Sequence, residues 1–182
     1  MTSGSMFYDA GPLEQIAVNL FYGWGYNFYR LENMMRADDL LVRSKVGWLL
    51  GRARDSVETA ESAYRRTFLP PPSRAKPLPD PSAVAGAQTL EKLSHDIGAL
   101  EGQIRAQPVP ETDRMTQVYR QEADTLARLA DCDRRLAGQA ELLRQTLEGK
   151  DGAWMIENLA TIGEGLGAIG ATLRDRQAVL LV

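Results

Sequence analysis

The sequence predicts an all-α protein, an antiparallel bundle of four to five long helices with a Pro-rich crossover linker. Proline placement is the first reason: apart from Pro12, every proline lies in the segment 69–82 or at Pro108 and Pro110. A proline inside a helix costs about 3 kcal/mol, so the long proline-free stretches permit long helices. Periodicity is the second reason, because these stretches repeat apolar residues every three or four positions. None shows the period-two alternation that is typical of a half-buried strand.

The length of the chain sets its domain organisation. A chain of 182 residues fits one domain and is long enough to bury a core without metals or disulfides. We therefore expect residues 1–182 to form a single helical-bundle domain. Its expected parts are a helical hairpin over 12–68, a Pro-rich linker over 69–82 and a three-helix segment over 83–182.

Two helices are expected before the linker. The first begins at Pro12, because proline suits the first position of a helix, and ends near Met35. The second begins after Asp38 or Asp39, either of which could cap it, and ends near Phe68. One continuous helix through both is the alternative. The second helix has an apolar face at three- and four-residue spacing: Val46, Leu49, Leu50, Ala53, Val57, Ala60 and Tyr64.

Three helices are expected after the linker. The first of them carries a heptad pattern typical of bundle packing: Leu90, Leu93, Ile97, Leu100 and Ile104. The next covers 111–148, and Gly149 suits its C-terminal cap. The last runs from Ala153 to the end of the chain. Its small residues Gly163, Gly167 and Ala171 are spaced by four, which would let a neighbouring backbone approach closely.

Charge and composition exclude several classes of protein. The formal net charge is −3 and the sequence pI is about 5.3, which argues against a nucleic-acid binder with a basic face. No apolar run reaches the roughly 20 residues of a membrane helix, so no integral membrane segment is expected. Cys132 is the single cysteine, and no intrachain disulfide can form. A reducing cytoplasm, of the bacterial type, is the expected location.

The sequence contains no catalytic or metal-binding signature. A ferritin-like di-metal centre needs two Glu-x-x-His pairs, and His95 is the one histidine here. His95 also falls off the apolar stripe of its helix, so we expect it at the surface. Cys132 falls on an apolar stripe between Asp131 and Asp133, where burial and negative charge raise a thiol's pKa. We therefore expect no enzyme, no metal site and no cofactor.

Aromatic residues concentrate in one short segment, since six of the thirteen fall between positions 21 and 29. On a helix they sort into two faces. One face carries Tyr22, Tyr26 and Tyr29. The opposite face carries Phe21, Trp24 and Phe28. The second face suits a core, whereas tyrosine suits a contact surface because it buries a ring while its hydroxyl stays hydrated.

This segment predicts a non-enzymatic protein-interaction module, such as an adaptor, chaperone or assembly factor. The expected partner is another protein or a second copy of the chain in a homodimer, contacted through Tyr22, Tyr26 and Tyr29. A first helix that is covered on both faces inside the fold is one alternative. A helical bundle that binds a small hydrophobic ligand in a cavity near Trp24, Phe28 and Trp48 is the other.

Overall fold

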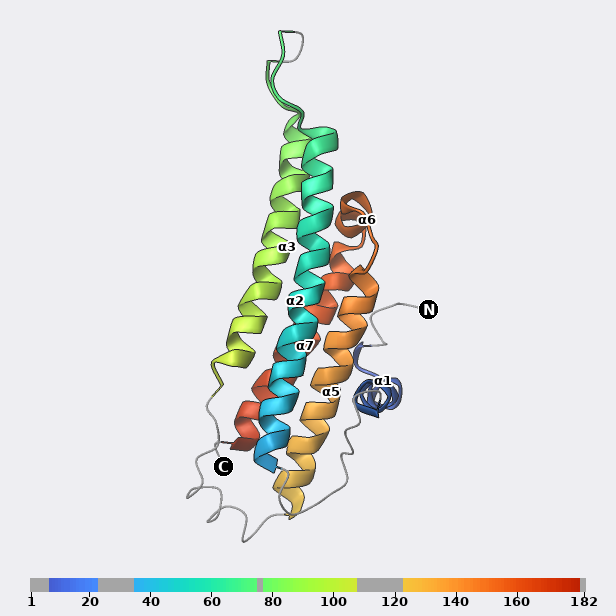
Figure 1. Cartoon of the computed structure of the whole chain (residues 1–182), viewed down its shortest axis with the longest axis vertical. Helices are drawn as coiled ribbons and strands as arrows, with labels where there is room; N and C mark the ends of the chain where they lie inside the picture. Colours follow the sequence, from blue (N-terminus) through green and yellow to red (C-terminus); the bar gives the residue numbers. More distant parts are fainter. Residues whose placement is uncertain (1–6, 23–34, 75–76, 108–122, 181–182) are drawn as a thin grey trace.

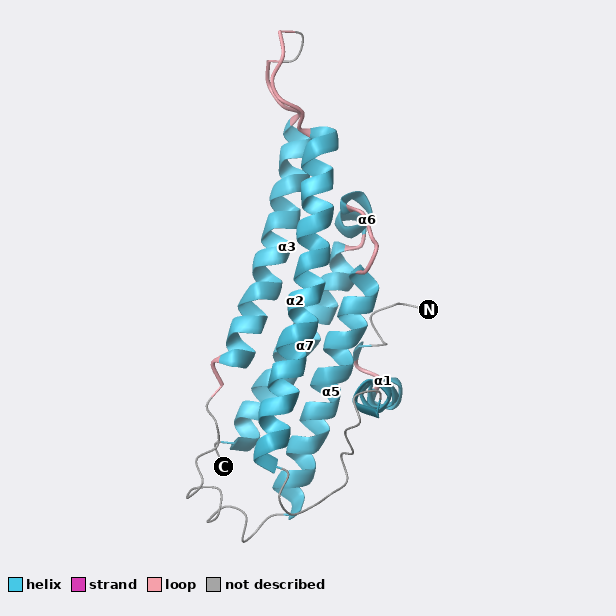
Figure 2. Cartoon of the chain, viewed as in Figure 1, coloured by secondary structure: helices cyan, strands magenta, loops and turns pink. Residues whose placement is uncertain are grey.

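The computed structural model describes residues 7–22, 35–74, 77–107 and 123–180. Within these ranges the chain forms helices joined by loops, without a strand (Figures 1 and 2). The predicted all-α helical bundle is confirmed. The helices are α1 (Ala10–Tyr22), α2 (Met35–Phe68), α3 (Pro81–Arg105), α5 (Ala123–Leu147), α6 (Gly152–Glu157) and α7 (Leu159–Leu180).

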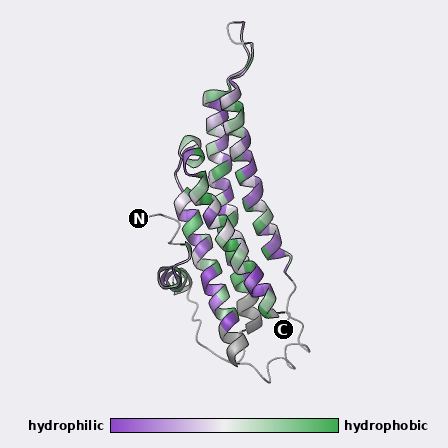
Figure 3. Ribbon diagram, turned by 180° about the vertical axis from the view of Figure 1, so that it is seen from behind, coloured by the Kyte–Doolittle hydropathy of each residue, from purple (hydrophilic) through white to green (hydrophobic). Residues whose placement is uncertain are grey.

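Four long helices enclose the core. α2 packs against α3 and α5, and α7 packs against α5 and α3 (Figure 1). The apolar face predicted for the second helix is the buried face of α2, since its residues from Val46 to Ala60 are buried and Tyr64 packs against the core. The heptad of α3 is confirmed in the same way, with Leu100 partly buried and the other four residues buried. Each helix therefore carries both hydrophobic and hydrophilic residues (Figure 3).

In the described residues, α2 and α3 form a hairpin, whereas the expected hairpin over 12–68 includes residues 23–34, which lie outside them. These two helices lie side by side, and the Pro-rich segment joins them at one end of the molecule (Figure 1). The segment projects beyond the helix ends instead of crossing the end of the bundle. The Asp80 carboxylate accepts a hydrogen bond from the Ser82 backbone N–H at 2.9 Å, and Pro81 occupies the first turn of α3. These are the usual features of a helix start, so α3 begins directly after the loop.

The first helix, α1, packs across α5 and makes no extensive contact with the described part of α2 (Figure 1). In the described residues α1 thus pairs with α5, and the expected pairing of the first two helices, which includes residues 23–34 outside them, stays a prediction. The physical reason for the contact of α1 with α5 lies at Gly138 of α5, where a Cβ atom would be 2.5 Å from the backbone oxygen of Leu13. Only glycine allows the two backbones to come this close. In Figure 1 α1 is seen nearly end-on while α2 follows the long axis of the molecule, so these two described helices point in different directions.

The last part of the chain forms two helices, α6 and α7, where one was expected. The break lies at Asn158, the C-cap of α6. Its side-chain amide donates a hydrogen bond at 2.9 Å to the backbone carbonyl of Trp154, a group near the C-terminal end of α6. The predicted close approach at Gly163 and Gly167 is also absent, because a Cβ at either position would meet open space. Gly149 does cap α5, with a φ of 69° that favours glycine.

The face of α7 that meets the molecule carries Gly165. A Cβ there would lie 2.9 Å from the ring of Phe7, which is buried. The backbone oxygen of Phe7 accepts a hydrogen bond from Gln139 Nε2 of α5 at 3.1 Å. Phe7, three residues before α1, thus fixes the start of the described chain to both α5 and α7. None of the described helices is long and apolar enough to cross a membrane.

Candidate functional site

The predicted contact residues lie at the edge of what the structure describes. Tyr22 is the last residue of α1, and only its backbone is described. Tyr26 and Tyr29, together with Trp24 and Phe28 of the predicted ligand cavity, lie outside the described residues. The structure therefore describes the helix that precedes the aromatic segment.

The two faces of α1 have different surroundings. Leu13 and Ala17 are fully buried against the bundle. Gln15 and Asn19 are exposed on the opposite side, and Gln15 Nε2 donates to Asn19 Oδ1 at 2.9 Å. Because a helix repeats every 3.6 residues, position 22 follows positions 15 and 19 along the outward face. Position 22 is thus in register with the exposed face of α1, and the contact role expected for the three tyrosines stays a prediction.

Trp48 is the one predicted cavity residue whose side chain the structure describes. It is 51% exposed on α2, and the ammonium group of Lys45 lies 4.4 Å from the centre of its ring. This distance is that of a cation–π contact. Trp48 therefore has a large exposed surface, unlike the wall of an enclosed apolar cavity.

Lys45 itself is buried, with 2% of its surface exposed. Burial lowers the pKa of its ammonium group to about 8, partly offset by the negative charge of Glu141. Glu141 is held by Arg144, which donates to both carboxylate oxygens at 2.8 and 2.9 Å. Burial opposes ionisation of Glu141, but the hydrogen bonds from Arg144 and Gln145 outweigh it and lower the pKa of this carboxyl. The result is a buried polar layer between α2 and α5.

A second buried polar cluster joins three helices and the end of α3. Arg176 of α7 donates to Asp133 Oδ1 of α5 at 2.8 Å and to Gln107 Oε1 at 2.7 Å. Arg43 of α2 donates to the backbone oxygen of Gln107 at 2.6 Å. Burial lowers the pKa of both arginines. A buried cluster of this kind specifies which helices are neighbours, because a mispaired helix would leave a charge without its partner.

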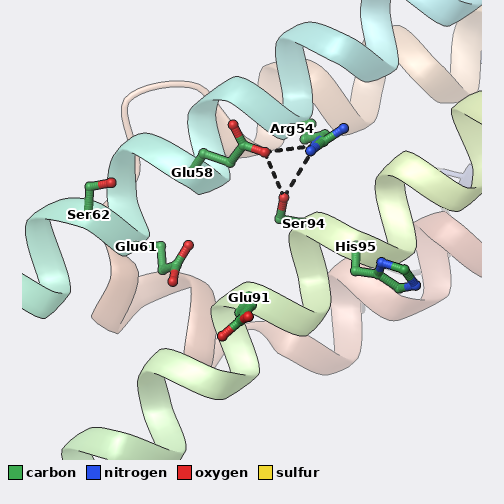
Figure 4. Close-up of a pocket in the computed structure, with 7 residues that line it drawn as sticks. All are labelled: Arg54, Glu58, Glu61, Ser62, Glu91, Ser94 and His95. Atoms are coloured by element: carbon green, nitrogen blue, oxygen red, sulfur yellow. Dashed lines mark hydrogen bonds and ion pairs between the residues drawn. The ribbon is translucent and has the colours of Figure 1, made fainter.

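An open polar groove of about 440 Å³ lies between α2 and α3 (Figure 4). Arg54 Nε donates to Glu58 Oε1 at 2.7 Å, and the Ser94 hydroxyl donates to the same carboxylate oxygen at 3.1 Å. Ser94 Oγ also lies 3.4 Å from Arg54 Nε. Further along, Arg65 bridges Glu61 of α2 and Glu91 of α3. Acidic and basic groups along the groove thus pair with each other.

This groove lacks the arrangement of a hydrolytic site. His95 points away from Ser94 and Glu58, so the serine has no histidine base (Figure 4). The Glu58 carboxylate is already paired with Arg54 at 2.7 Å. The wall consists of helices whose backbone N–H groups are already bonded, so it offers no oxyanion hole. The groove is best explained as a polar seam that aligns α2 with α3.

Cys132 lies buried on α5, and His95 lies exposed on α3, as the sequence predicted for each. Burial raises the pKa of the Cys132 thiol, which disfavours the reactive thiolate. Within the described ranges, no three histidine, cysteine, aspartate or glutamate side chains converge as metal ligands. Asp133, which the sequence marks as a carboxylate beside Cys132, is instead paired with Arg176.

The sequence did not predict the buried basic residues Arg43, Lys45 and Arg176. A signal for Arg176 was present, because it continues the spacing of Ile162, Ile169 and Leu173 along one face of α7. A basic residue at a core position is unusual and points to a paired charge.

The chain was compared with known protein families, curated proteins and solved structures, and none of them matches.

Proposed function

We propose that this protein is a non-enzymatic interaction module, an adaptor, chaperone or assembly factor, that presents its aromatic first helix to a protein partner or to a second copy. The proposed contact residues are Tyr22, Tyr26 and Tyr29. The observation that carries the proposal is the two-sided environment of α1. Its inner face is fixed to α5, and its outer face, at Gln15 and Asn19, is exposed.

Rigid attachment of α1 suits it to recognition. Leu13 meets α5 at Gly138, and Arg134 Nη1 of α5 lies 3.0 Å from Glu14 Oε1 of α1. A helix that is already ordered loses little conformational entropy when it binds, so more of the contact free energy remains as affinity. The attachment therefore favours α1 as a preformed surface.

Tyrosine at the centre of such a surface contributes strongly to binding. The ring buries apolar area and the hydroxyl keeps a hydrogen bond, and truncation of an aromatic anchor commonly costs about 2 kcal/mol or more. Three such residues on one face would account for most of the affinity of a modest interface. The buried charges, in contrast, pair with other groups inside the fold.

The test compares the wild-type protein with the Tyr22→Ser/Tyr26→Ser/Tyr29→Ser variant. The absolute mass of each is measured by light scattering, and folding is followed by circular dichroism. Phe68→Ser is the control, because Phe68 is 51% exposed on α2, away from α1. We expect a wild-type dimer that the triple variant converts to a folded monomer and that Phe68→Ser leaves intact.

If the wild-type protein is a monomer, the test is made with a protein partner instead. A protein captured by the wild type is then purified and its affinity measured, and we expect the triple variant to bind at least thirtyfold more weakly, about 2 kcal/mol. The proposal fails if the triple variant keeps its stability, its mass and every partner. It also fails if the variant unfolds, since the tyrosines would then belong to the core.

A further inference from the structure

The tip of the α2–α3 hairpin is a second exposed surface, separate from α1. We define the tip as residues 65–74 and 77–80, which lie at one extreme of the long axis of the molecule (Figure 1). Leu78 is 81% exposed and Phe68 is 51% exposed. These are two of the five large exposed apolar side chains in the described residues, and the hairpin brings them to the same end of the molecule.

The charge of the tip is opposite to that of the chain. The sequence from 65 to 80 holds four basic residues and one acidic residue, a formal charge of +3, whereas the whole chain carries −3. Arg65 is occupied by Glu61 and Glu91. Arg66 and Arg74 form no ion pair within the described residues, and both are exposed. The tip is therefore a basic, apolar end on an acidic molecule.

The backbone of the tip is unusually poor in hydrogen-bond donors. Six of the thirteen residues from 69 to 81 are proline, which has no backbone N–H. A backbone N–H that leaves water without a new partner is costly, so a Pro-rich turn enters a poorly hydrated environment more easily than an ordinary turn. This property favours an environment such as the boundary between lipid headgroups and acyl chains.

The apolar residues of the tip stand on a rigid support. The ring of Phe68 packs on that of Tyr64 with centroids 4.6 Å apart, and Tyr64 contacts the core. On the other side of the loop, the Asp80 cap fixes the start of α3. Phe68 and Leu78 thus lie at the projecting end of the α2–α3 hairpin, whereas the chain as a whole is acidic.

We propose that the hairpin tip docks on the surface of an anionic lipid bilayer. Phe68 and Leu78 enter the headgroup boundary, while Arg66 and Arg74 lie at the lipid phosphates. The tip is narrow and projects outward, so it offers little area for a stable protein interface, which needs about 800 Å² on each partner. A bilayer requires no matching pocket, and its negative charge complements the tip. This inference goes beyond the proposed function and does not depend on it.

The experiment is co-sedimentation of the full chain with vesicles at low salt. One set of vesicles is phosphatidylcholine alone, and the other is an equimolar mixture with phosphatidylglycerol. We expect binding to the anionic vesicles only, weakened by salt. A basic residue near an anionic surface strengthens binding about fivefold, so Arg66→Gln/Arg74→Gln should weaken it roughly thirtyfold. Phe68→Ser/Leu78→Ser should weaken it about tenfold or more.

Matched controls separate the tip from the general charge and apolar surface of the molecule. Arg128→Gln/Arg174→Gln removes two exposed arginines at the other end of the bundle, and Leu159→Ser removes an exposed leucine of α7. Both variants should bind anionic vesicles as the wild type does. Thermal unfolding of every variant checks that the fold is unchanged.

Three results would overturn the proposal. The first is that the wild type does not sediment with anionic vesicles. The second is that the tip variants bind as well as the wild type, and the third is that the control variants lose binding to the same extent as the tip variants. A polyglutamate peptide serves as an acidic protein mimic. If it binds with the same dependence on Arg66 and Arg74 while the vesicles do not bind, the tip is a docking site for an acidic protein and the bilayer is the wrong partner.

Discussion

Gly138 shows how a single residue determines where a helix packs. In α5, this position faces the backbone of Leu13, and a Cβ would lie 2.5 Å from its oxygen and 3.0 Å from its carbonyl carbon. Backbone atoms cannot rotate away as a flexible side chain can, so α1 would have to move. The position of α1 on α5 therefore depends on the absence of one methyl group.

The Gly138→Ala variant should accordingly destabilise the protein by about 1–3 kcal/mol, the usual range for overpacking. Urea unfolding monitored by circular dichroism measures the change. Gly102→Ala in α3 is the matched control, because a Cβ there meets nothing within 4 Å. This control should stabilise α3 by up to about 1 kcal/mol through the higher helix propensity of alanine. Equal effects of the two substitutions would contradict the close packing of α1 on α5.

Lys45 makes the stability of the protein depend on pH. Its pKa falls from 10.5 to about 8 in the folded state, chiefly because burial disfavours the charged form. Between these two pH values the unfolded chain binds more protons than the folded one. The free energy of unfolding should therefore rise with pH across this window, by about 2–3 kcal/mol relative to a variant without the amine.

Urea unfolding of the wild type and of Lys45→Met between pH 7.5 and pH 10.5 tests this expectation. The difference between the two proteins isolates Lys45 from the tyrosines that titrate at high pH. Lys92→Met, which removes an exposed lysine of α3, should show the same pH dependence as the wild type. A constant difference between wild type and Lys45→Met would mean that the amine titrates normally.

At the scale of elements, Phe7 holds α1 in place. Its buried ring packs on Gly165 of α7 and its carbonyl oxygen accepts from Gln139 of α5. The hairpin of α2 and α3 is held independently by its own apolar faces and by the ion pairs along its groove. The two parts of the molecule should therefore open separately.

The Phe7→Ala variant should release α1 while the hairpin stays folded. Hydrogen exchange followed by mass spectrometry should show faster exchange in α1 and unchanged exchange in the centre of α2 and α3. Tyr8→Ala is the control, because the neighbouring Tyr8 is 63% exposed. Uniformly faster exchange throughout the chain would instead show that α1 and the bundle unfold together.

The helices that were predicted well are those with strong periodicity. Val46, Leu50 and Val57 mark the buried face of α2, and Leu90 with Ile97 marks that of α3, because burial imposes the helical repeat on the sequence. Periodicity identifies the face that is buried and says nothing of the neighbour. The pairing of α1 with α5 was therefore missed, since it depends on backbone proximity at one glycine.

Other differences have equally local causes. The break at Asn158 contains neither proline nor glycine, so the sequence gives no ordinary signal for it. Lys45 and Arg176 are buried near acidic groups that are distant in the sequence, Glu141 and Asp133 respectively. A charged residue on a helix is usually solvated, so the sequence alone did not predict their burial. Of the predicted site, Tyr22 is described by its backbone alone and Tyr26 and Tyr29 lie outside the described residues, so the site stays a prediction.

At the scale of the whole molecule, the two proposed surfaces lie on different parts of the fold. α1 is attached to the side of the bundle at α5, and the hairpin tip projects from one end (Figure 1). Between them lies a core of packed apolar residues and paired charges. Substitutions at surfaces that share no contacts are expected to act independently.

This separation predicts a double dissociation. The Tyr22→Ser/Tyr26→Ser/Tyr29→Ser variant should lose self-association or partner binding and keep its affinity for anionic vesicles. Phe68→Ser/Leu78→Ser should lose vesicle binding and keep its mass in solution. The combined variant should lose both by the sum of the two free-energy changes, within about 0.5 kcal/mol.

If the tip variant also abolished association, the hairpin tip would be part of the protein interface, since Phe68 and Leu78 would then be buried between molecules and not in lipid. If only the tyrosine variant reduced vesicle binding, avidity from a dimer with two tips would explain it, and a linked pair of tips in one chain should restore binding.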